Sequence, residues 1–452
     1  MTPPTWTYRS SLPGAVWPAI PGQESASLLA LQFQFEQSQW LAPERLREQQ
    51  FRQIEALLRH AYDTVPYYHE RWRGFYDPGQ ALAPDGFSRV PLMNRGDIQS
   101  QGEKLLSRRV PAEHGRVMKG ETSGSTGSPI TFYSTDLSQF YWNGCTLRDH
   151  FWHRRDFSGK LAVIRKGVLQ AALPSWGLPM ELVFQTGPGV TLDLGADIDT
   201  QLEWLQREQP DYLLSYPSNI AELARCSRQR RIRLARLREV RTIGEAMAPE
   251  TRKLCREAWG VPLTDAYSSQ EAGYLALQCP GHEHYHVQSE SVMLEILDEQ
   301  GVACAPGETG RVVLTTLHNF AMPLIRYEIG DYAEAGPPCP CGRGLPVITR
   351  ILGRQRNMLT LPDGRRRWPS FPSEKWSYAA PVRQLQLVQR ARERIEVRVV
   401  PERALSDGER ARLVGAMQDC LGRSFILELR EVAEIPRSAS LKYEDFISEI
   451  AT

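Results

Sequence analysis

Apolar residues between positions 26 and 60 recur at the spacing of an amphipathic helix, as at Leu28, Leu31 and Leu57. This pattern predicts helices that cap the N-terminal end of the fold. The run Val65-Pro66-Tyr67-Tyr68 then interrupts the helical pattern, because proline disfavours a continued helix. A polar, proline-containing region follows and extends to about residue 122.

From residue 161 onward, short apolar runs alternate with helical patterns. The apolar runs predict buried strands at Leu161–Ile164, Asp211–Ser215 and Val240–Ile243. The helical patterns cover Thr200–Glu208 and Asn219–Gln229. Strands that alternate with helices favour an α/β fold in layers, with a parallel sheet.

After Tyr285 the pattern changes to short strands that are separated by turn residues, as in the segment 306–310. These strands predict a small barrel or sheet. They cover Val292–Leu297, Arg311–Leu317 and Tyr332–Ala333.

A third pattern begins at about residue 354 and predicts a separate, small α+β domain. Its strands are expected at Gln384–Gln389, Ile395–Val400 and Phe425–Val432, and its helix at Ser406–Leu421. The resulting division is a large N-terminal domain, 1–353, with a β-rich subdomain at about 285–345, and a C-terminal domain, 354–452.

Composition agrees with a globular protein of more than one domain. The chain has 452 residues, 41% hydrophobic and 24% charged, and a formal net charge of +1. No run reaches the roughly 18 apolar residues that cross a bilayer, and no leader pattern opens the chain. We therefore expect no membrane span and a cytoplasmic location, in which eight Cys would not form a disulfide framework.

The segment Thr122-Ser123-Gly124-Ser125-Thr126-Gly127-Ser128-Pro129 combines hydroxyls and glycines, and it is too polar for a core. Glycine lets the backbone turn sharply and bring its N–H groups close to an anion, while hydroxyls add uncharged donors. The segment lacks the Gly-Lys-Ser/Thr ending of the nucleoside triphosphatase P-loop. By itself it fits either a phosphate-binding loop or a flexible Ser/Gly linker.

Four further segments follow this loop in order, and with it they resemble the core motifs of adenylate-forming enzymes, the superfamily of acyl- and aryl-CoA ligases. They are Ile243-Gly244-Glu245-Ala246, Asp265-Ala266-Tyr267-Ser268-Ser269-Gln270-Glu271, Arg326-Tyr327-Glu328-Ile329-Gly330-Asp331 and Gly353-Arg354-Gln355-Arg356. The resemblance covers nearly the whole chain and is most specific to the phenylacetate-CoA ligase and CapK-like branch. It implies an α/β fold: a large N-terminal domain of layered sheets and helices, a small β-barrel-like subdomain, and a small mobile α+β C-terminal domain.

The resemblance also assigns roles in an ATP site. Glu271 matches the acidic residue that helps to hold Mg²⁺, an ion that requires hard oxygen ligands. Asp331 matches the residue that accepts hydrogen bonds from the ribose hydroxyls, and Arg354 should contact the same ligand. The loop residues that would hold the β- and γ-phosphates are Ser123, Gly124, Ser125, Thr126 and Gly127. The residues expected at the adenine are Gly244, Glu245, Tyr267 and the adjacent Ser268.

Near the C-terminus, the segment Ile435–Tyr443 resembles the motif that delivers the catalytic lysine, which makes Lys442 the candidate. A flexible ammonium group can follow the charge that develops between the carboxylate oxygen and phosphorus. The chain has only 7 Lys against 47 Arg, so a lysine in this motif is distinctive. Leu441 stands where the family usually has glycine.

Members of the family rotate the small domain between adenylation and acyl transfer. The pivot position matches Arg356, where Asp or Lys is usual. The segment 353–357 is the one evident joint between two sequence patterns.

A second constellation joins Cys279-Pro280-Gly281-His282-Glu283-His284-Tyr285-His286 to Cys339-Pro340-Cys341-Gly342. Thiolate and imidazole groups suit tetrahedral Zn²⁺, and a site with four protein ligands would be structural. Free cysteines and surface histidines are the alternative. The favoured ligands are Cys279, His286, Cys339 and Cys341, with His282 or His284 able to replace His286.

These features predict an enzyme in which Lys442 and Glu271 act in catalysis. Its substrates would be ATP with Mg²⁺, a small-molecule carboxylic acid, and a thiol acceptor, CoA by default, or an amine or carrier protein. Trp142, Phe132 and Tyr133 could line an acyl pocket, although aromatic residues at such positions are more often core.

Two other hypotheses remain from the sequence. Leu441 and Arg356 favour a catalytically weak nucleotide-binding relative. The Cys/His pairs suggest a zinc-ribbon nucleic-acid binder, but the near-zero net charge argues against nucleic acid as a partner. The sequence does not give the acid or the oligomeric state, which includes the option of a homodimer.

Overall fold

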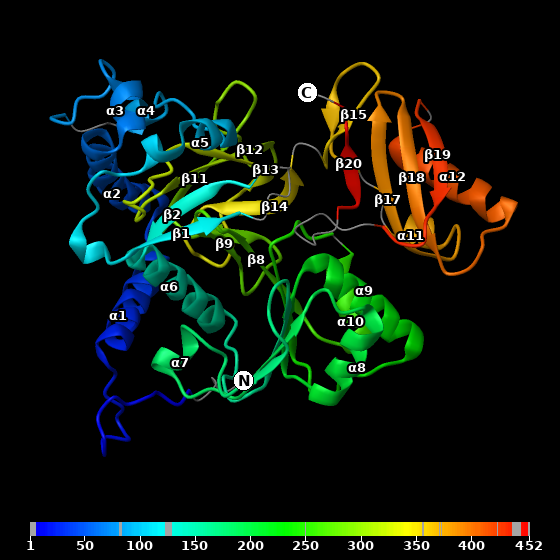
Figure 1. Cartoon of the computed structure of the whole chain (residues 1–452), viewed down its shortest axis with the longest axis horizontal. Helices are drawn as coiled ribbons and strands as arrows, with labels where there is room; N and C mark the ends of the chain where they lie inside the picture. Colours follow the sequence, from blue (N-terminus) through cyan, green and yellow to red (C-terminus); the bar gives the residue numbers. More distant parts are fainter. Residues whose placement is uncertain are drawn as a thin grey trace.

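The computed structural model describes residues 6–450 except 81–83, 123–128, 249, 355, 356, 370, 372, 423 and 436–443. A large N-terminal α/β domain and a smaller C-terminal domain lie side by side (Figure 1). No helix in the described part of the chain is long and apolar enough to cross a membrane.

One mixed sheet of 12 strands runs through the large domain, in the order β11-β12-β13-β14-β10-β9-β8-β7-β6-β3-β5-β4. Strands β5, β3, β6, β7 and β8 are parallel neighbours, and the other pairs are antiparallel. The large-domain strands, with the separate β1–β2 hairpin, are β1 (Val117–Glu121), β2 (Thr131–Thr135), β3 (Leu161–Arg165), β4 (Ala171–Leu173), β5 (Gly189–Asp193), β6 (Tyr212–Ser215), β7 (Glu239–Ile243), β8 (Leu263–Ser269), β9 (Gly273–Gln278), β10 (Tyr285–Val287), β11 (Val292–Leu297), β12 (Thr309–Thr316), β13 (Tyr327–Gly336) and β14 (Val347–Arg354).

Helices cover both faces of the parallel part of this sheet. Helices α8, α9 and α10 pack on one face, where Leu213 and Val240 join a single apolar cluster with Leu205 and Leu223. Helices α1, α6 and α7 cover the other face. The helices of this domain are α1 (Gln23–Ser38), α2 (Pro43–Thr64), α3 (Pro66–Trp72), α4 (Pro84–Phe87), α5 (Arg95–Gln101), α6 (Asp136–Trp152), α7 (Met180–Val183), α8 (Ile198–Glu208), α9 (Pro217–Arg230) and α10 (Thr251–Trp259), with 3₁₀ turns at Gly102–Leu105 and Ala112–His114.

The predicted α/β layers are confirmed, and the strands and helices expected between 161 and 243 lie within two residues of their predicted bounds. The β-rich segment at about 285–345 does not close into a barrel of its own, which was one of the two forms predicted for it. Strand β10 pairs with both β9 and β14, so the antiparallel strands continue the large sheet as an open extension. This pairing joins segments about 60 residues apart, which local sequence patterns do not reveal.

The C-terminal domain is a four-stranded sheet in the order β19-β18-β17-β20, preceded by the short β15–β16 hairpin. Helix α12 packs on this sheet through Leu413 and Met417, and Ser406 caps it by accepting a hydrogen bond from the Glu409 N–H. The elements are β15 (Leu359–Thr360), β16 (Arg366–Arg367), α11 (Ser373–Ser377), β17 (Val382–Ala391), β18 (Arg394–Pro401), α12 (Asp407–Leu421), β19 (Ile426–Glu431) and β20 (Phe446–Ser448).

Candidate active site

A cleft of about 1360 Å³ lies where the carboxyl ends of β6, β7 and β8 meet β13, β14 and the C-terminal domain. In open parallel sheets, ligands bind outside the carboxyl ends of the strands. Every predicted nucleotide-site residue that the structure describes lines this cleft: Gly244, Glu245, Tyr267, Ser268, Glu271, Asp331 and Arg354. The other predictions, Ser123, Gly124, Ser125, Thr126, Gly127, Arg356 and Lys442, lie outside the described residues.

The first residue of the Ser/Gly segment, Thr122, is described and lines the cleft. Its N–H donates to the Ile130 carbonyl at 3.0 Å, and its hydroxyl accepts from the Ile130 N–H at 3.1 Å. Thr122, at the start of this segment, therefore lies beside the cleft and is hydrogen-bonded to Ile130.

Asp331, Tyr267 and Arg354 form one polar group in the cleft. Asp331 on β13 is the register partner of Arg354 on β14, and Arg354 Nε lies 3.4 Å from Asp331 Oδ1. The Tyr267 hydroxyl donates to Asp331 Oδ2 at 2.8 Å. Burial, reinforced by the Asp331 carboxylate, raises the pKa of Tyr267 well above its usual value, so the phenol keeps its proton and donates. The Asp331 carboxylate is thereby fixed in place as a hydrogen-bond acceptor.

Glu271 follows β8 and is 8% exposed. Burial raises the pKa of this carboxyl group, and the Ser269 hydroxyl opposes that shift only in part. No ion pair of Glu271 occurs within the described ranges of the chain. A carboxylate supplies the hard oxygen ligands that a divalent ion such as Mg²⁺ prefers, so Glu271 could hold such an ion in the cleft.

The turn after β7 depends on glycine. Gly244 has φ of +80°, a conformation that other residues adopt at a cost. The next residue, Glu245, accepts a hydrogen bond from the Ser218 N–H in the first turn of α9 at 3.0 Å. A carboxylate is stabilised at a helix N-terminus, so Glu245 fixes α9 against the cleft wall.

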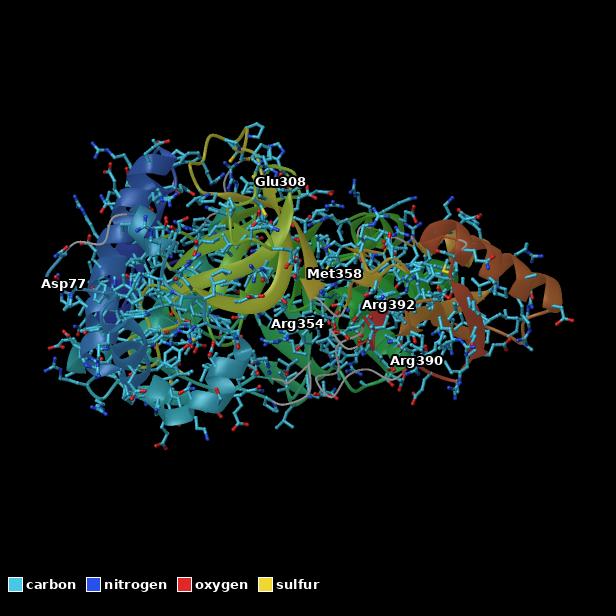
Figure 2. The ribbon with its side chains drawn as sticks, turned by 90° about the horizontal axis from the view of Figure 1, so that it is seen from above. Asp77, Glu308, Arg354, Met358, Arg390 and Arg392 are labelled. Atoms are coloured by element: carbon cyan, nitrogen blue, oxygen red, sulfur yellow. The ribbon has the colours of Figure 1, made fainter. Side chains whose placement is uncertain are left out.

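Asn357 connects the end of the large sheet to the C-terminal domain. Its Oδ1 accepts from the Arg354 N–H at 3.0 Å, and its Nδ2 donates to the Phe446 carbonyl at 2.7 Å. Figure 2 shows Arg354 at the junction of the two domains. The contact was not predicted, because its partners lie 89 residues apart.

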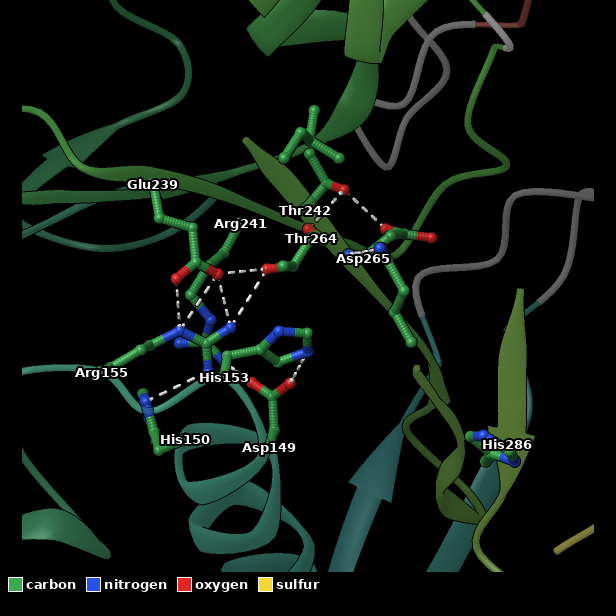
Figure 3. A network of polar contacts seen from close by, with 12 residues as sticks. Asp149, His150, His153, Arg155, Glu239, Arg241, Thr242, Thr264, Asp265 and His286 are labelled. Carbon is green, nitrogen blue, oxygen red and sulfur yellow. Dashed lines mark hydrogen bonds and ion pairs between the residues drawn. The ribbon is translucent and has the colours of Figure 1, made fainter. Parts of the chain in front are cut away.

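A buried network of charged side chains lies between α6 and β7, and Arg241 of this network lines the cleft (Figure 3). Arg155 Nη1 lies 2.7 Å from Asp149 Oδ2, and Arg155 Nη2 lies 2.6 Å from Glu239 Oε1. Arg241 Nη2 also reaches Asp149 Oδ2, at 2.5 Å. Burial raises the pKa of Asp149 and of Glu239, but the guanidinium groups outweigh burial and hold both pKa values below their usual range.

The sequence did not predict the residues of this network. They come from α6, the turn after it and β7, with one or two from each, and no local motif joins them. Of the three aromatic residues considered for an acyl pocket, Trp142 lines the cleft. Phe132 and Tyr133 instead pack against the apolar core beside β9–β14.

The predicted metal ligands lie together in a second cluster, between the β9–β10 turn and the loop before β14. One donor atom from each of Cys279, His284, His286 and Cys339 lies within 4.8 Å of the others. Cys341 Sγ is 3.4 Å from His286 Nε2. This group contains three of the four favoured ligands, Cys279, His286 and Cys339, and its fourth member is His284, one of the two alternatives. The fourth favoured ligand, Cys341, lies next to the group through its contact with His286.

The distances in this cluster fit a thiolate metal site. Cys279 Sγ and Cys339 Sγ are 3.9 Å apart, far beyond the roughly 2.05 Å of a disulfide. Two sulfurs on a tetrahedral Zn²⁺, each at about 2.3 Å, are separated by about 3.8 Å. The cluster could therefore hold zinc and tie the two turns together.

We expect the Asp331→Asn variant to weaken ATP binding by about 10- to 100-fold, because a hydrogen bond to a charged group contributes about 1.5–3 kcal/mol. Isothermal titration with ATP under non-turnover conditions measures this. Asp363→Asn is the matched control, since Asp363 lies outside the cleft and pairs with Arg365 on the surface. Equal ATP affinity in the two variants would contradict the ribose role of Asp331.

No family model matches the chain. It is similar to a phenylacetate-coenzyme A ligase of Thermus thermophilus, with 26% identity over 340 residues, 71% of this chain and 73% of the relative. It is also similar to a phenylacetate-coenzyme A ligase of Pseudomonas putida, with 24% identity over 70% of this chain and 72% of that relative.

Among solved structures, the fold is similar to a 2-hydroxyisobutyryl-CoA ligase. The TM-score is 0.74 against its postadenylation state in complex with R3-HIB-AMP, at 18% identity, with 92% of each chain covered. Against its thioesterification state with 2-HIB-AMP and CoA the TM-score is 0.60, at 20% identity, with 91% of each chain covered.

Proposed function

Because this chain belongs to the adenylate-forming superfamily and is a distant homologue of phenylacetate-CoA ligases, we propose that it activates an aryl or acyl carboxylic acid with ATP. The acid becomes an acyl-adenylate and pyrophosphate is released, after which the acyl group passes to a thiol, CoA by default. The observation that carries this proposal is the gathering of Tyr267, Glu271, Asp331 and Arg354 in one cleft.

In the first step, a carboxylate oxygen attacks the α-phosphorus of ATP, and the bond from that phosphorus to the bridging oxygen of pyrophosphate breaks. Asp331 would accept from the ribose hydroxyls, while Tyr267 and Arg354 hold its carboxylate. The Ser/Gly loop, Ser123 to Gly127, would bind the departing phosphates with N–H and hydroxyl donors. Glu271 would hold Mg²⁺, which neutralises charge on the phosphates.

Lys442 is the proposed catalytic cation of this step. Its ammonium group would stabilise the negative charge that builds on the oxygens between the acid and phosphorus. The closest described residue that follows Lys442 in the chain is Glu444, and Glu444, Asp445 and Phe446 all line the cleft. The position of this segment supports a role for Lys442 there.

The second step is acyl transfer. The solved ligase in its thioesterification state contains CoA, which supports CoA as the acceptor, while an amine or a carrier protein remains the alternative. Arg356 is the proposed pivot for rotation of the C-terminal domain between the two steps. The cysteine and histidine cluster is proposed to hold a structural zinc ion, with Cys279, His286, Cys339 and Cys341 as ligands.

ATP–pyrophosphate exchange over a panel of carboxylic acids tests this function. We expect exchange that depends on one class of acid and on Mg²⁺, because formation of the adenylate is reversible. ATP binding without exchange would instead support the catalytically weak relative. A folded protein that shows neither ATP binding nor exchange would contradict both.

A further inference from the structure

The cleft extends beyond the nucleotide residues into an arm between β3, β6, β7 and α6. We define this acyl arm by the cleft-lining residues on that side of the sheet. They are Trp142, His150, Trp176, Arg241, Ile243 and Tyr274. Most of them are apolar or aromatic, so the arm suits a flat, apolar group.

Arg241 lies at the inner end of this arm. Gly244 follows β7 at the end of the strand that opens into the cleft, and Arg241 lies three residues earlier on the strand. Because a strand rises about 3.3 Å per residue, Arg241 lies roughly 10 Å deeper than Gly244. Residues 241 and 243 share a strand face, and the Ile243 side chain packs with Cys145 and Tyr274 on the α6 side. Arg241 therefore faces the arm from its floor.

The Arg241 guanidinium is only partly used by the protein. It is 7% exposed, and its Nη2 donates to Asp149. No second partner of Arg241 occurs among the described residues, yet its other nitrogens are not sealed in protein. A guanidinium has five N–H donors, so several remain available to a ligand.

His150 supplies a second donor. Its Nδ1 lies 3.4 Å from Arg155 Nη1, which can only donate, so Nδ1 accepts and the ring proton is on Nε2. Burial keeps the pKa of His150 well below its usual value, so the ring is neutral. Within the described chain Nε2 has no hydrogen-bond partner, and His150 lines the arm beside Trp176, with 5.4 Å between ring centroids.

The charges of the surrounding network already balance. Arg155 and Arg241 carry two positive charges, and Asp149 and Glu239 carry two negative charges at close range. A second full charge on the substrate would have no counter-ion here and would be costly to bury. An uncharged oxygen, in contrast, can accept from both donors.

We infer that the acid is aromatic and carries an uncharged hydrogen-bond acceptor, such as a hydroxyl group, at the ring end opposite its carboxylate, where Arg241 and His150 bind it. This inference rests on the proposed function. An apolar substituent would leave two buried donors unpaired, and such sites discriminate strongly against the analogue that lacks the polar group. Arg241 and His150 thus determine specificity.

Pairs of acids that differ only at the far ring position test the inference. They are the 4-hydroxy and 4-methyl forms of benzoate, phenylacetate and cinnamate, compared by kcat/KM in ATP–pyrophosphate exchange. In the wild-type protein we expect the hydroxy form to be preferred at least about tenfold in the accepted pair. In Arg241→Met the preference should fall to about one or reverse, and in His150→Phe it should fall several-fold.

Both acids of a pair are measured on the same protein, so the ratio of their kcat/KM values does not depend on how much of the enzyme is active. His150→Phe leaves the ion pairs of Arg155 and Arg241 intact, so it provides the test if Arg241→Met does not fold. Arg236→Met is the control, because the exposed Arg236 side chain pairs with Asp211 and does not line the cleft; its ratio should equal that of the wild-type protein.

A wild-type preference for the methyl form, or a ratio unchanged in the folded variants, would overturn the inference. Exchange with other acids but with none of these pairs would overturn it too, and would leave the proposed function standing. Absence of exchange with every acid would contradict the proposed function itself, and this inference with it.

Discussion

The Lys442→Ala variant is expected to lose adenylation by at least about 100-fold, the scale found when one preorganised donor to a transition-state charge is removed. The loss should appear in kcat of ATP–pyrophosphate exchange, with little change in ATP affinity. The reason is that the ammonium group acts on charge that develops only as the acid attacks phosphorus. An interaction made only in the transition state lowers kcat when it is lost.

Lys375→Ala is a matched control for this experiment, because Lys375 is an exposed lysine of the same domain and does not line the cleft. Its rate should equal that of the wild-type protein. An unchanged forward rate in Lys442→Ala would remove Lys442 from the mechanism. Restored ATP–pyrophosphate exchange in Lys442→Ala with an added small primary amine would further support the role of the ammonium group.

Loss of the proposed zinc ion is expected to have the second large effect. The purified protein should contain about one zinc per chain, and Cys339→Ser should lose it and unfold at a temperature about 10 °C lower. Cys339 connects the β13–β14 loop to the β9–β10 turn through Cys279 and His284. Without the ion, three or more metal-binding groups would remain close together and unsatisfied.

Elemental analysis and thermal unfolding measure the two outcomes. Cys226→Ser is the control, since this cysteine lies on α9 near Glu222 and away from the cluster. Less than about half an equivalent of zinc in undamaged wild-type protein would contradict a structural zinc site. Replacement of His284 and His286 in turn shows which of the two imidazoles is required.

Much of the fold follows from local sequence. The strand at Leu161–Arg165 and the helix at Asp407–Leu421 agree closely with their predicted bounds, because apolar spacing and the capping residue Ser406 act within a few positions. What local patterns could not give is the order of the strands. The pairing of β10 with β14 is set by contacts between distant segments, so the continuous sheet emerges only in three dimensions.

The candidate site divides in the same way. Glu271, Asp331 and Arg354 stand in motifs with neighbours that mark them, and the structure brings them to one cleft. Arg241 and His150 stand in ordinary strand and helix patterns, and only the packing of α6 against β7 gives them a common surface. Position in a motif identified the residues proposed to bind the nucleotide, whereas Arg241 and His150 could be identified only from the tertiary fold.

The contacts of Asn357 have a thermodynamic consequence. One amide connects the backbone of Arg354, which contacts Asp331, with the backbone of Phe446 in the C-terminal domain. Asn357 and Phe446 both follow the proposed pivot at Arg356 and would move together, so a rotation of that domain would break the bond between Asn357 and the Arg354 N–H and alter the surroundings of Arg354. If bound nucleotide shifts the equilibrium between domain orientations toward one of them by some factor, a domain held in that orientation binds nucleotide more tightly by the same factor. Under the proposed function, domain position and ATP affinity would therefore be linked reciprocally, and an acceptor that selects a different orientation would promote release of AMP.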